Sequence, residues 1–139
     1  MKRVFLSFAY EDTQKVKNLV PELMSPDFDI DFYEGSSDID FDSEAATSIK
    51  RAIGEKITKC NVTVCLIGEH TYTCKWVDCQ LNKSRHKGNK IIAMALKGEE
   101  WAVLPRQIKE ENITFYPWNP KKLAMLICEN EAKPFNNSL

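Results

Sequence analysis

Short apolar runs alternate along the chain with stretches in which apolar residues recur at helical spacing. Four of the runs are nearly continuous in apolar or β-branched residues, which is typical of strands buried in a parallel sheet. A fifth run alternates Phe28, Ile30 and Phe32 with aspartates, which predicts a half-buried strand near an edge of the sheet. The predicted strands cover residues 3–8, 28–33, 62–67, 91–96 and 113–116.

Helical periodicity fills the intervals between these strands. Val16, Leu19, Val20 and Leu23 recur at i, i+3, i+4 and i+7, and Pro21 is expected to end or kink that helix. Ser43 is a candidate N-cap for the second helix, and Gly88 is a candidate C-cap for the third. The predicted helices lie at about residues 16–23, 43–57, 75–86 and 123–127.

Strands that alternate with helices predict an α/β fold. We expect a flavodoxin-like three-layer sandwich with a five-stranded, mainly parallel sheet, formed by one domain over residues 1–139. Ligands bind such sheets beyond the carboxyl ends of the strands, where the strand order reverses. The segments that are expected at that edge are residues 8–12, 33–42, 68–76 and 96–101.

The charge balance and the length of the apolar runs limit the kinds of partner that are expected. Lys plus Arg (19) nearly balances Asp plus Glu (20), so the formal net charge is −1. Neither nucleic acid nor an anionic membrane surface is expected as a partner, because both select a basic excess. The apolar runs are far shorter than the ~20 residues of a transmembrane helix, and the first one stops at Ser7. A cytoplasmic location is therefore expected.

The five cysteines predict reduced, buried thiols rather than a metal site. Cys60 and Cys65 are five positions apart on a predicted strand, which places them on opposite faces. Cys74 and Cys79 would lie roughly 140° apart on a helix. No metal is expected. Cys128 has no cysteine near it in the sequence.

The segment after the first strand lacks the glycines of a dinucleotide or phosphate-binding loop. Phe8 and Tyr10, with Ala9 between them, offer aromatic surface to a flat ring instead. The structural alternative is that Phe8 belongs to the core and that Asp12 caps the first helix.

Trp76 and Gln80 stand at i and i+4, so they lie one above the other on the third helix. An indole can pack against a sugar while an amide one turn later hydrogen-bonds the sugar's hydroxyls, although a tryptophan taken alone is more often part of the core. His70 and His86 are the two histidines. His70, in a loop at the carboxyl edge, is the better candidate for a ligand contact.

Four segments together resemble one family, the TIR-like proteins of the bacterial Thoeris antiphage defence system. The opening run 3–10 is similar to the family's first strand, and the other three similar segments are residues 64–71, 75–77 and 87–92. They occur in the family's order and spacing and span roughly residues 3 to 97. The last part of the chain adds little.

The resemblance implies an enzyme that cleaves NAD as its substrate, without a further cofactor, and makes a signalling nucleotide that a partner effector senses. It implies a TIR-like fold, pocket contacts from Ser36, Ser37 and Asp38, and a possible homo-oligomer. The family's catalytic glutamate stands four positions beyond the tryptophan, and Gln80 occupies that position here. An amide keeps the shape but carries no charge, so we expect binding to survive and the chemistry to be slow.

Two explanations of Gln80 stay open. The chain is either an inactivated version of an enzyme, which we favour because the rest of the site is intact, or a natural binding or assembly module. Asp78 is a poor substitute, because two positions back on a helix turn it roughly 200° away. A receiver-like phosphoacceptor is a third possibility, but the third strand ends in Ile67-Gly68-Glu69 rather than in an aspartate. The fifth strand ends in Tyr116-Pro117-Trp118 rather than in a lysine.

Overall fold

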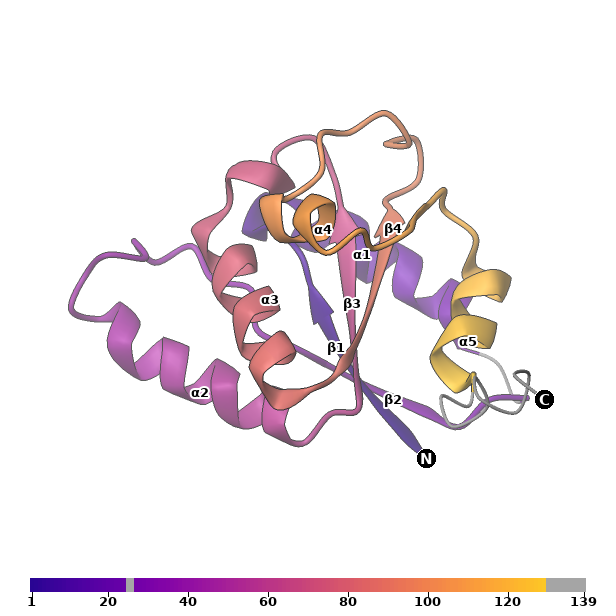
Figure 1. The fold of residues 1–139 in the computed structure, drawn as a ribbon, viewed down its shortest axis with the longest axis horizontal. Helices are drawn as coiled ribbons and strands as arrows, with labels where there is room; N and C mark the ends of the chain where they lie inside the picture. The colour runs from indigo at the N-terminus through magenta and orange to yellow at the C-terminus, as the bar shows by residue number, and fades with distance from the viewer. Residues whose placement is uncertain (25–26, 130–139) are drawn as a thin grey trace.

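A five-stranded parallel sheet has the strand order β2-β1-β3-β4-β5. The sheet lies at the centre of the molecule (Figure 1). The computed structural model describes residues 1–24 and 27–129 of the chain. Every neighbouring pair of strands is parallel. The strands are β1 (Lys2–Ser7), β2 (Ile30–Glu34), β3 (Val62–Ile67), β4 (Lys90–Ala95) and β5 (Phe115–Tyr116).

Helices cover both faces of this sheet, which confirms the predicted three-layer α/β architecture (Figure 1). The α-helices are α1 (Thr13–Leu19), α2 (Ala46–Thr58), α3 (Lys75–Lys87), α4 (Arg106–Glu110) and α5 (Pro120–Cys128). Three short 3₁₀ turns are η1 (Tyr10–Asp12), η2 (Val20–Leu23) and η3 (Thr71–Thr73). None of the helices in the described part of the chain is long and apolar enough to cross a membrane.

Alternation along β1 divides the core between the two faces. Val4, Leu6 and Phe8 point into a cluster with α1 and α5, whereas Phe5 points into a cluster with α2. The next residue on the Phe5 side is Ser7, which is also fully buried. β3 is buried at every position, as its continuous apolar sequence predicts for a central strand.

The ends of the elements follow local chemistry, with one correction. Gly88 ends α3 in the left-handed conformation (φ 87°), as predicted for a C-cap. α1 ends at Leu19, and Pro21 lies in the 3₁₀ turn that follows. The prediction that Ser43 caps the second helix is wrong: α2 begins after Ala45, and the Ser43 hydroxyl donates to the Asp40 carbonyl instead (2.7 Å).

α4 is the element that the sequence did not predict, and β2 begins later than expected. α4 has only five residues and buries only Gln107 and Ile108, so it has no periodic apolar stripe to recognise. β2 starts at Ile30 rather than at Phe28, and it forms one edge of the sheet as its aspartates predicted.

The order of the strands places a topological switch between β1 and β3. The chain moves from β1 outward to β2, then returns past β1 to β3 and continues outward on the other side. The carboxyl ends of β1 and β3 are therefore the place where ligands bind in sheets of this kind.

Candidate functional site

Gln80 lies on the face of α3 that packs toward the carboxyl end of β1. Its side chain is fully buried (0% exposed). The Ser7 hydroxyl donates to Gln80 Oε1 at 2.6 Å, and Gln80 Nε2 donates to the carbonyl of Gly35 at 3.1 Å. The amide thus connects β1, α3 and the segment after β2 at the switch point.

Trp76 shares this face one helical turn earlier, as the i, i+4 spacing predicted. Its indole is buried and packs with Phe5 and Ile53, so the core interpretation of Trp76 holds for most of its surface. Its Nε1 donates to the carbonyl of Ile39 at 2.8 Å. Trp76 and Gln80 therefore bind the same loop through two different backbone carbonyls.

That loop, residues 35–45, connects β2 to α2 and is called the β2–α2 loop below. Besides the two bonds from α3, it forms an ion pair between Asp42 and Lys75 (2.6 Å) and an edge-on ring contact between Phe41 and Trp76, with centroids 5.0 Å apart. At its start, Lys56 of α2 donates to the Glu34 carbonyl (2.7 Å). The loop is therefore folded down on α2 and α3 and covers the candidate catalytic position.

Gly35 is packed closely in this arrangement. A Cβ at this position would lie 2.9 Å from Ile53 Cγ1 and 3.5 Å from the Phe5 ring. Such a contact is too short for an ordinary side chain, so the close approach requires a glycine here. The Gly35 carbonyl is thereby held within reach of Gln80.

The three ligand contacts that were predicted after the first strand have different surroundings in the structure. Phe8 is 2% exposed and belongs to the core on the α1 and α5 side, which is the structural alternative given for it. Ala9 is also buried, whereas Tyr10 begins η1 and is 48% exposed. Of the three, Tyr10 is the one with substantial surface to offer a ligand.

The remaining predicted contacts lie on loops. Ser36 and Ser37 bond locally: Ser36 donates to Oε1 of Glu34 at the end of β2, and Ser37 Oγ accepts from the Ile39 amide. Asp38 is exposed in the same loop. His70 is exposed between β3 and η3, with Nε2 3.5 Å from Glu69 Oε1. These side chains surround the edge that was predicted, but no hydrogen bond from them to Gln80 is present among the described contacts.

Asp12 is an unusual carboxyl at the same edge. It occupies the N-cap position of α1, yet its side chain makes no capping bond, which corrects the prediction that it caps the helix. It is 3% exposed, and its Oδ2 has no hydrogen-bond partner among the described residues. Burial raises the pKa of this carboxyl, and the nearby Lys15 ammonium opposes that rise in pKa.

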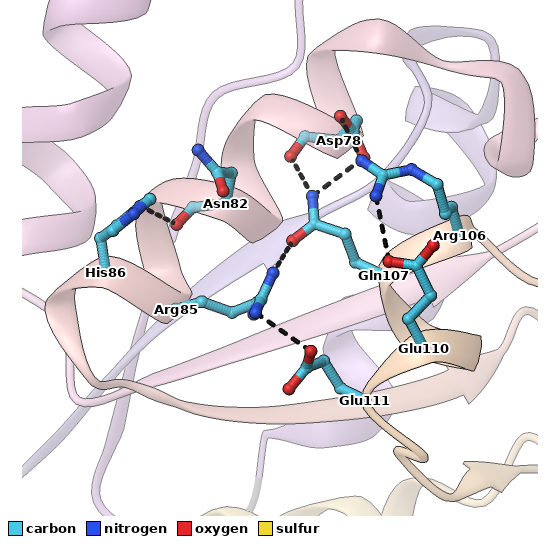
Figure 2. Close-up of polar contacts among 8 residues, drawn as sticks. All are labelled: Asp78, Asn82, Arg85, His86, Arg106, Gln107, Glu110 and Glu111. Carbon is cyan, nitrogen blue, oxygen red and sulfur yellow. Dashed lines mark hydrogen bonds and ion pairs between the residues drawn. The ribbon is translucent and has the colours of Figure 1, made fainter.

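The opposite face of α3 binds α4. Gln107 donates to both the carbonyl and the carboxylate of Asp78 (2.8 and 2.9 Å), and Arg85 donates to Gln107 Oε1 (2.9 Å), as Figure 2 shows. Arg106 lies 3.3 Å from the Asp78 carboxylate. Asp78 is therefore engaged with α4 and points away from the Gln80 face, as its helical position predicted.

A surface pocket of about 410 Å³ opens beside this site, between the β2–α2 loop, α3 and α4. Gln80 is not among the residues that line it. Those residues are Phe41, Lys75, Asp78, Cys79, Asn82, Arg106 and Gln107.

The cysteines are free thiols in the part of the chain that the structure describes. Burial raises the pKa of Cys60 to about 11 and that of Cys65 to about 12. Both thiols therefore stay protonated near neutral pH and behave as small apolar residues.

Ser7 and Gly35 are the two residues of the site that sequence reasoning missed. They are 73 and 45 positions from Gln80, and spacing along one helix cannot reveal such contacts. A signal for Ser7 was nevertheless present, because it is the polar residue within the otherwise apolar run 4–9. As it stands, the site holds a neutral amide at position 80.

Together, the strand order and the helices on both faces of the sheet define an α/β domain of the flavodoxin-like class. Residues 5–100 match the family described as "Thoeris protein ThsB, TIR-like domain", and the chain belongs to this family. A curated relative, "Putative cyclic ADP-D-ribose synthase ThsB1" of Bacillus cereus (strain MSX-D12), is 32% identical in an alignment 102 residues long, and the match covers 67% of this chain and 50% of the relative. The chain thus spans about half the length of that relative.

Two solved structures share the fold at low sequence identity. The TIR domain of the Toll-related receptor TRR-2 from Hydra magnipapillata superposes with a TM-score of 0.59 at 19% identity, covering 89% of this chain and 90% of the receptor domain. A 2-deoxyribosyltransferase from Bacillus psychrosaccharolyticus gives a TM-score of 0.61 at 16% identity, covering 94% of each chain.

Proposed function

We propose that this domain binds NAD at the carboxyl ends of β1 and β3, and that its family chemistry is cleavage of the bond between nicotinamide and ribose. The ADP-ribose part would become a signalling nucleotide for a partner effector in antiphage defence. Family membership and the name of the Bacillus cereus relative support this proposal. The observation that carries it is the position of residue 80, buried on α3 beside the switch point.

The role of residue 80 in this proposal is electrostatic. Positive charge develops on the ribose as nicotinamide leaves, and a carboxylate held close to that carbon would stabilise it. Gln80 has the same shape without the charge. Losing a preorganised electrostatic contact typically costs on the order of 10²–10³ in rate, so the chain as it stands should be slow or inactive.

The other proposed contacts belong to binding rather than to bond breaking. Tyr10, exposed in η1 after β1, would stack on a ring of the dinucleotide, and His70, on the loop after β3, would contact it at the rim. Ser36, Ser37 and Asp38 belong to the loop that covers residue 80, and they would contact the dinucleotide from that loop.

Nicotinamide release from NAD tests the proposal directly. We expect the Gln80→Glu variant to release nicotinamide at least about a hundredfold faster than the parent chain. Chromatography of the nucleotide products then identifies the acceptor that replaces nicotinamide. Lys83→Gln, one turn further along α3, is a matched control for a change on the same helix and is expected to release no more nicotinamide than the parent.

A second candidate function is a non-catalytic binding or assembly module. The specific observation in its favour is that both polar ends of the Gln80 side chain are satisfied inside the protein. If the Gln80→Glu variant releases no nicotinamide, even with lysate of phage-infected cells as an activator, the enzymatic proposal is wrong and this second function takes its place.

A further inference from the structure

The amide of Gln80 joins two segments that are far apart in the sequence. Its oxygen accepts from the Ser7 hydroxyl, and its nitrogen donates to the Gly35 carbonyl. A carbonyl can only accept, so the group that faces Gly35 must be a donor. The side chains of Ser7 and Gln80 are both 0% exposed, so neither has water as an alternative partner.

Ser7 determines which way this amide points. Its hydroxyl holds Oε1 at 2.6 Å, and this fixed end directs Nε2 toward the β2–α2 loop. The same orientation would suit a glutamate, because the hydroxyl can donate to a carboxylate as readily as to an amide oxygen. Ser7 thus acts on whatever side chain stands at position 80.

We propose that Ser7 is a positioning residue for the side chain at position 80, and that the Gln80 amide uses this orientation to keep the β2–α2 loop closed over the site. The closure of the loop does not depend on whether the protein cleaves NAD. Only the effect of the closure on NAD cleavage rests on the proposed function.

A glutamate at position 80 reverses the interaction with the loop. Ser7 still donates to one carboxylate oxygen, but the other oxygen faces the Gly35 carbonyl, and neither of these two atoms carries a hydrogen. The contact turns from a hydrogen bond into a repulsion, so the loop is released. A protonated glutamate regains a donor and restores the closed arrangement. The negative charge at position 80 that the proposed chemistry needs would therefore also open the β2–α2 loop and give NAD access to the site.

Other groups hold the loop independently of residue 80. Lys56 donates to the Glu34 carbonyl, and Lys75 pairs with Asp42. These charged groups are the same in the parent chain and in the Gln80→Glu variant. A pH-dependent difference between the two proteins therefore reports on residue 80.

The indole N–H of Trp76 is a direct reporter of the loop, because it donates to the Ile39 carbonyl. Its solvent exchange can be followed by NMR, with the 95% exposed Trp101 as an internal reference. In the Gln80→Glu variant we expect the Trp76 N–H to exchange about tenfold faster while the glutamate is ionised. Exchange should return to the parent rate when the pH falls below the glutamate pKa, whereas the parent shows no such step.

Three further variants separate the parts of the mechanism. Ser7→Ala should speed Trp76 exchange in the parent, and Ser7→Thr, which keeps the hydroxyl, should restore protection. Gly35→Ala is a positive control for an open loop, because its Cβ would lie 2.9 Å from Ile53 Cγ1 while residue 80 is unchanged. If Gln80→Glu does not fold, Gln80→Met removes both hydrogen bonds without a charge and should also speed exchange.

The outcomes distinguish this proposal from the proposed function. Unchanged Trp76 exchange in Gln80→Glu and Gln80→Met overturns closure by the amide, even where Gln80→Glu releases nicotinamide. Unchanged exchange in Ser7→Ala overturns the role of Ser7. Faster exchange that reverses on acidification, together with no nicotinamide release, supports the closure and contradicts the enzymatic function.

Discussion

At the scale of single residues, Asp12 stands out because its burial works against stability. Its Oδ2 has no partner among the described residues, and a Cβ on Gly68 would lie 2.5 Å from it. Lys15 is the nearest cation, 4.0 Å from Oδ1, and is itself 57% exposed. A buried carboxyl oxygen without a hydrogen-bond partner lowers the stability of the folded state. A residue with a purely structural role would not need such an oxygen at the edge where ligands bind.

We expect Asp12→Asn to stabilise the fold by about 1 kcal/mol at neutral pH. Desolvation raises the pKa of Asp12 above its ordinary value of 3.8, so the unfolded chain ionises at a lower pH than the folded one. Stability is therefore lost as the pH rises from 3.8 through the folded-state pKa and stays lower above it. Denaturant unfolding near neutral pH and near pH 3.8 should show the advantage of Asp12→Asn shrinking on acidification.

The matched control for this measurement is Glu11→Gln, which changes an exposed neighbour. It should alter the free energy of unfolding by less than about 0.5 kcal/mol. An Asp12→Asn variant that is less stable than the parent at neutral pH would show that the carboxylate has a favourable partner after all.

Only the part of the site that lies on one helix could be predicted from the sequence. The i, i+4 relation of Trp76 and Gln80 is a property of one helix, so the sequence alone places them on one face. Ser7 and Gly35 meet Gln80 only after the sheet and the β2–α2 loop are in place. Contacts of that kind depend on tertiary packing, and local spacing carries no information about them.

At the scale of elements, the stability of α4 comes from side-chain hydrogen bonds to α3 rather than from the helix itself. A helix of five residues is too short to be stable alone, so its position must come from its contacts with α3. Gln107, 2% exposed, supplies three of those bonds to Asp78 and Arg85 (Figure 2). This buried amide is the centre of the α3–α4 contact.

Gln107→Ala is expected to destabilise the protein by about 1–3 kcal/mol, because it removes the three hydrogen bonds that this buried side chain makes to Asp78 and Arg85. Hydrogen exchange should show the loss of protection concentrated in residues 106–112. Arg106→Ala is the control: it removes surface ion pairs to Asp78 and Glu110 and should cost less than about 1 kcal/mol. Equal effects of the two variants would contradict a central role for Gln107.

Elements with strong periodic patterns were predictable, and those held by tertiary contacts were not. The apolar runs of β3 and β4 and the Gly88 end of α3 were visible in the sequence because each depends on local patterning. Ser43 failed as an N-cap because its hydroxyl turns back to Asp40 within the β2–α2 loop. That loop takes its shape from α2 and α3, so its capping choices are set by distant residues.

At the scale of the whole molecule, the sheet brings together loops that the sequence separates. Contacts at the carboxyl edge connect α1, the turn after β3 and the segment after β4: Asp12 lies against Gly68, and Lys15 lies 3.8 Å from Glu99. The alternation of strands and helices was enough to predict this edge, since right-handed crossovers leave few arrangements of a parallel sheet. Which loop would cover residue 80 was not predictable from that rule.

The position of β1 inside the sheet also has a consequence for how the chain acquires its structure. β1 pairs with β3 on its inner side, and Arg3 meets Asn61, 58 positions later. During synthesis the first strand therefore emerges long before its inner neighbour exists, and contacts that are distant in sequence slow folding. Until β3 arrives, the apolar β1 segment is exposed to wrong partners, so the yield of correctly folded protein should depend on chaperones or on slow synthesis more than the small size of the domain suggests.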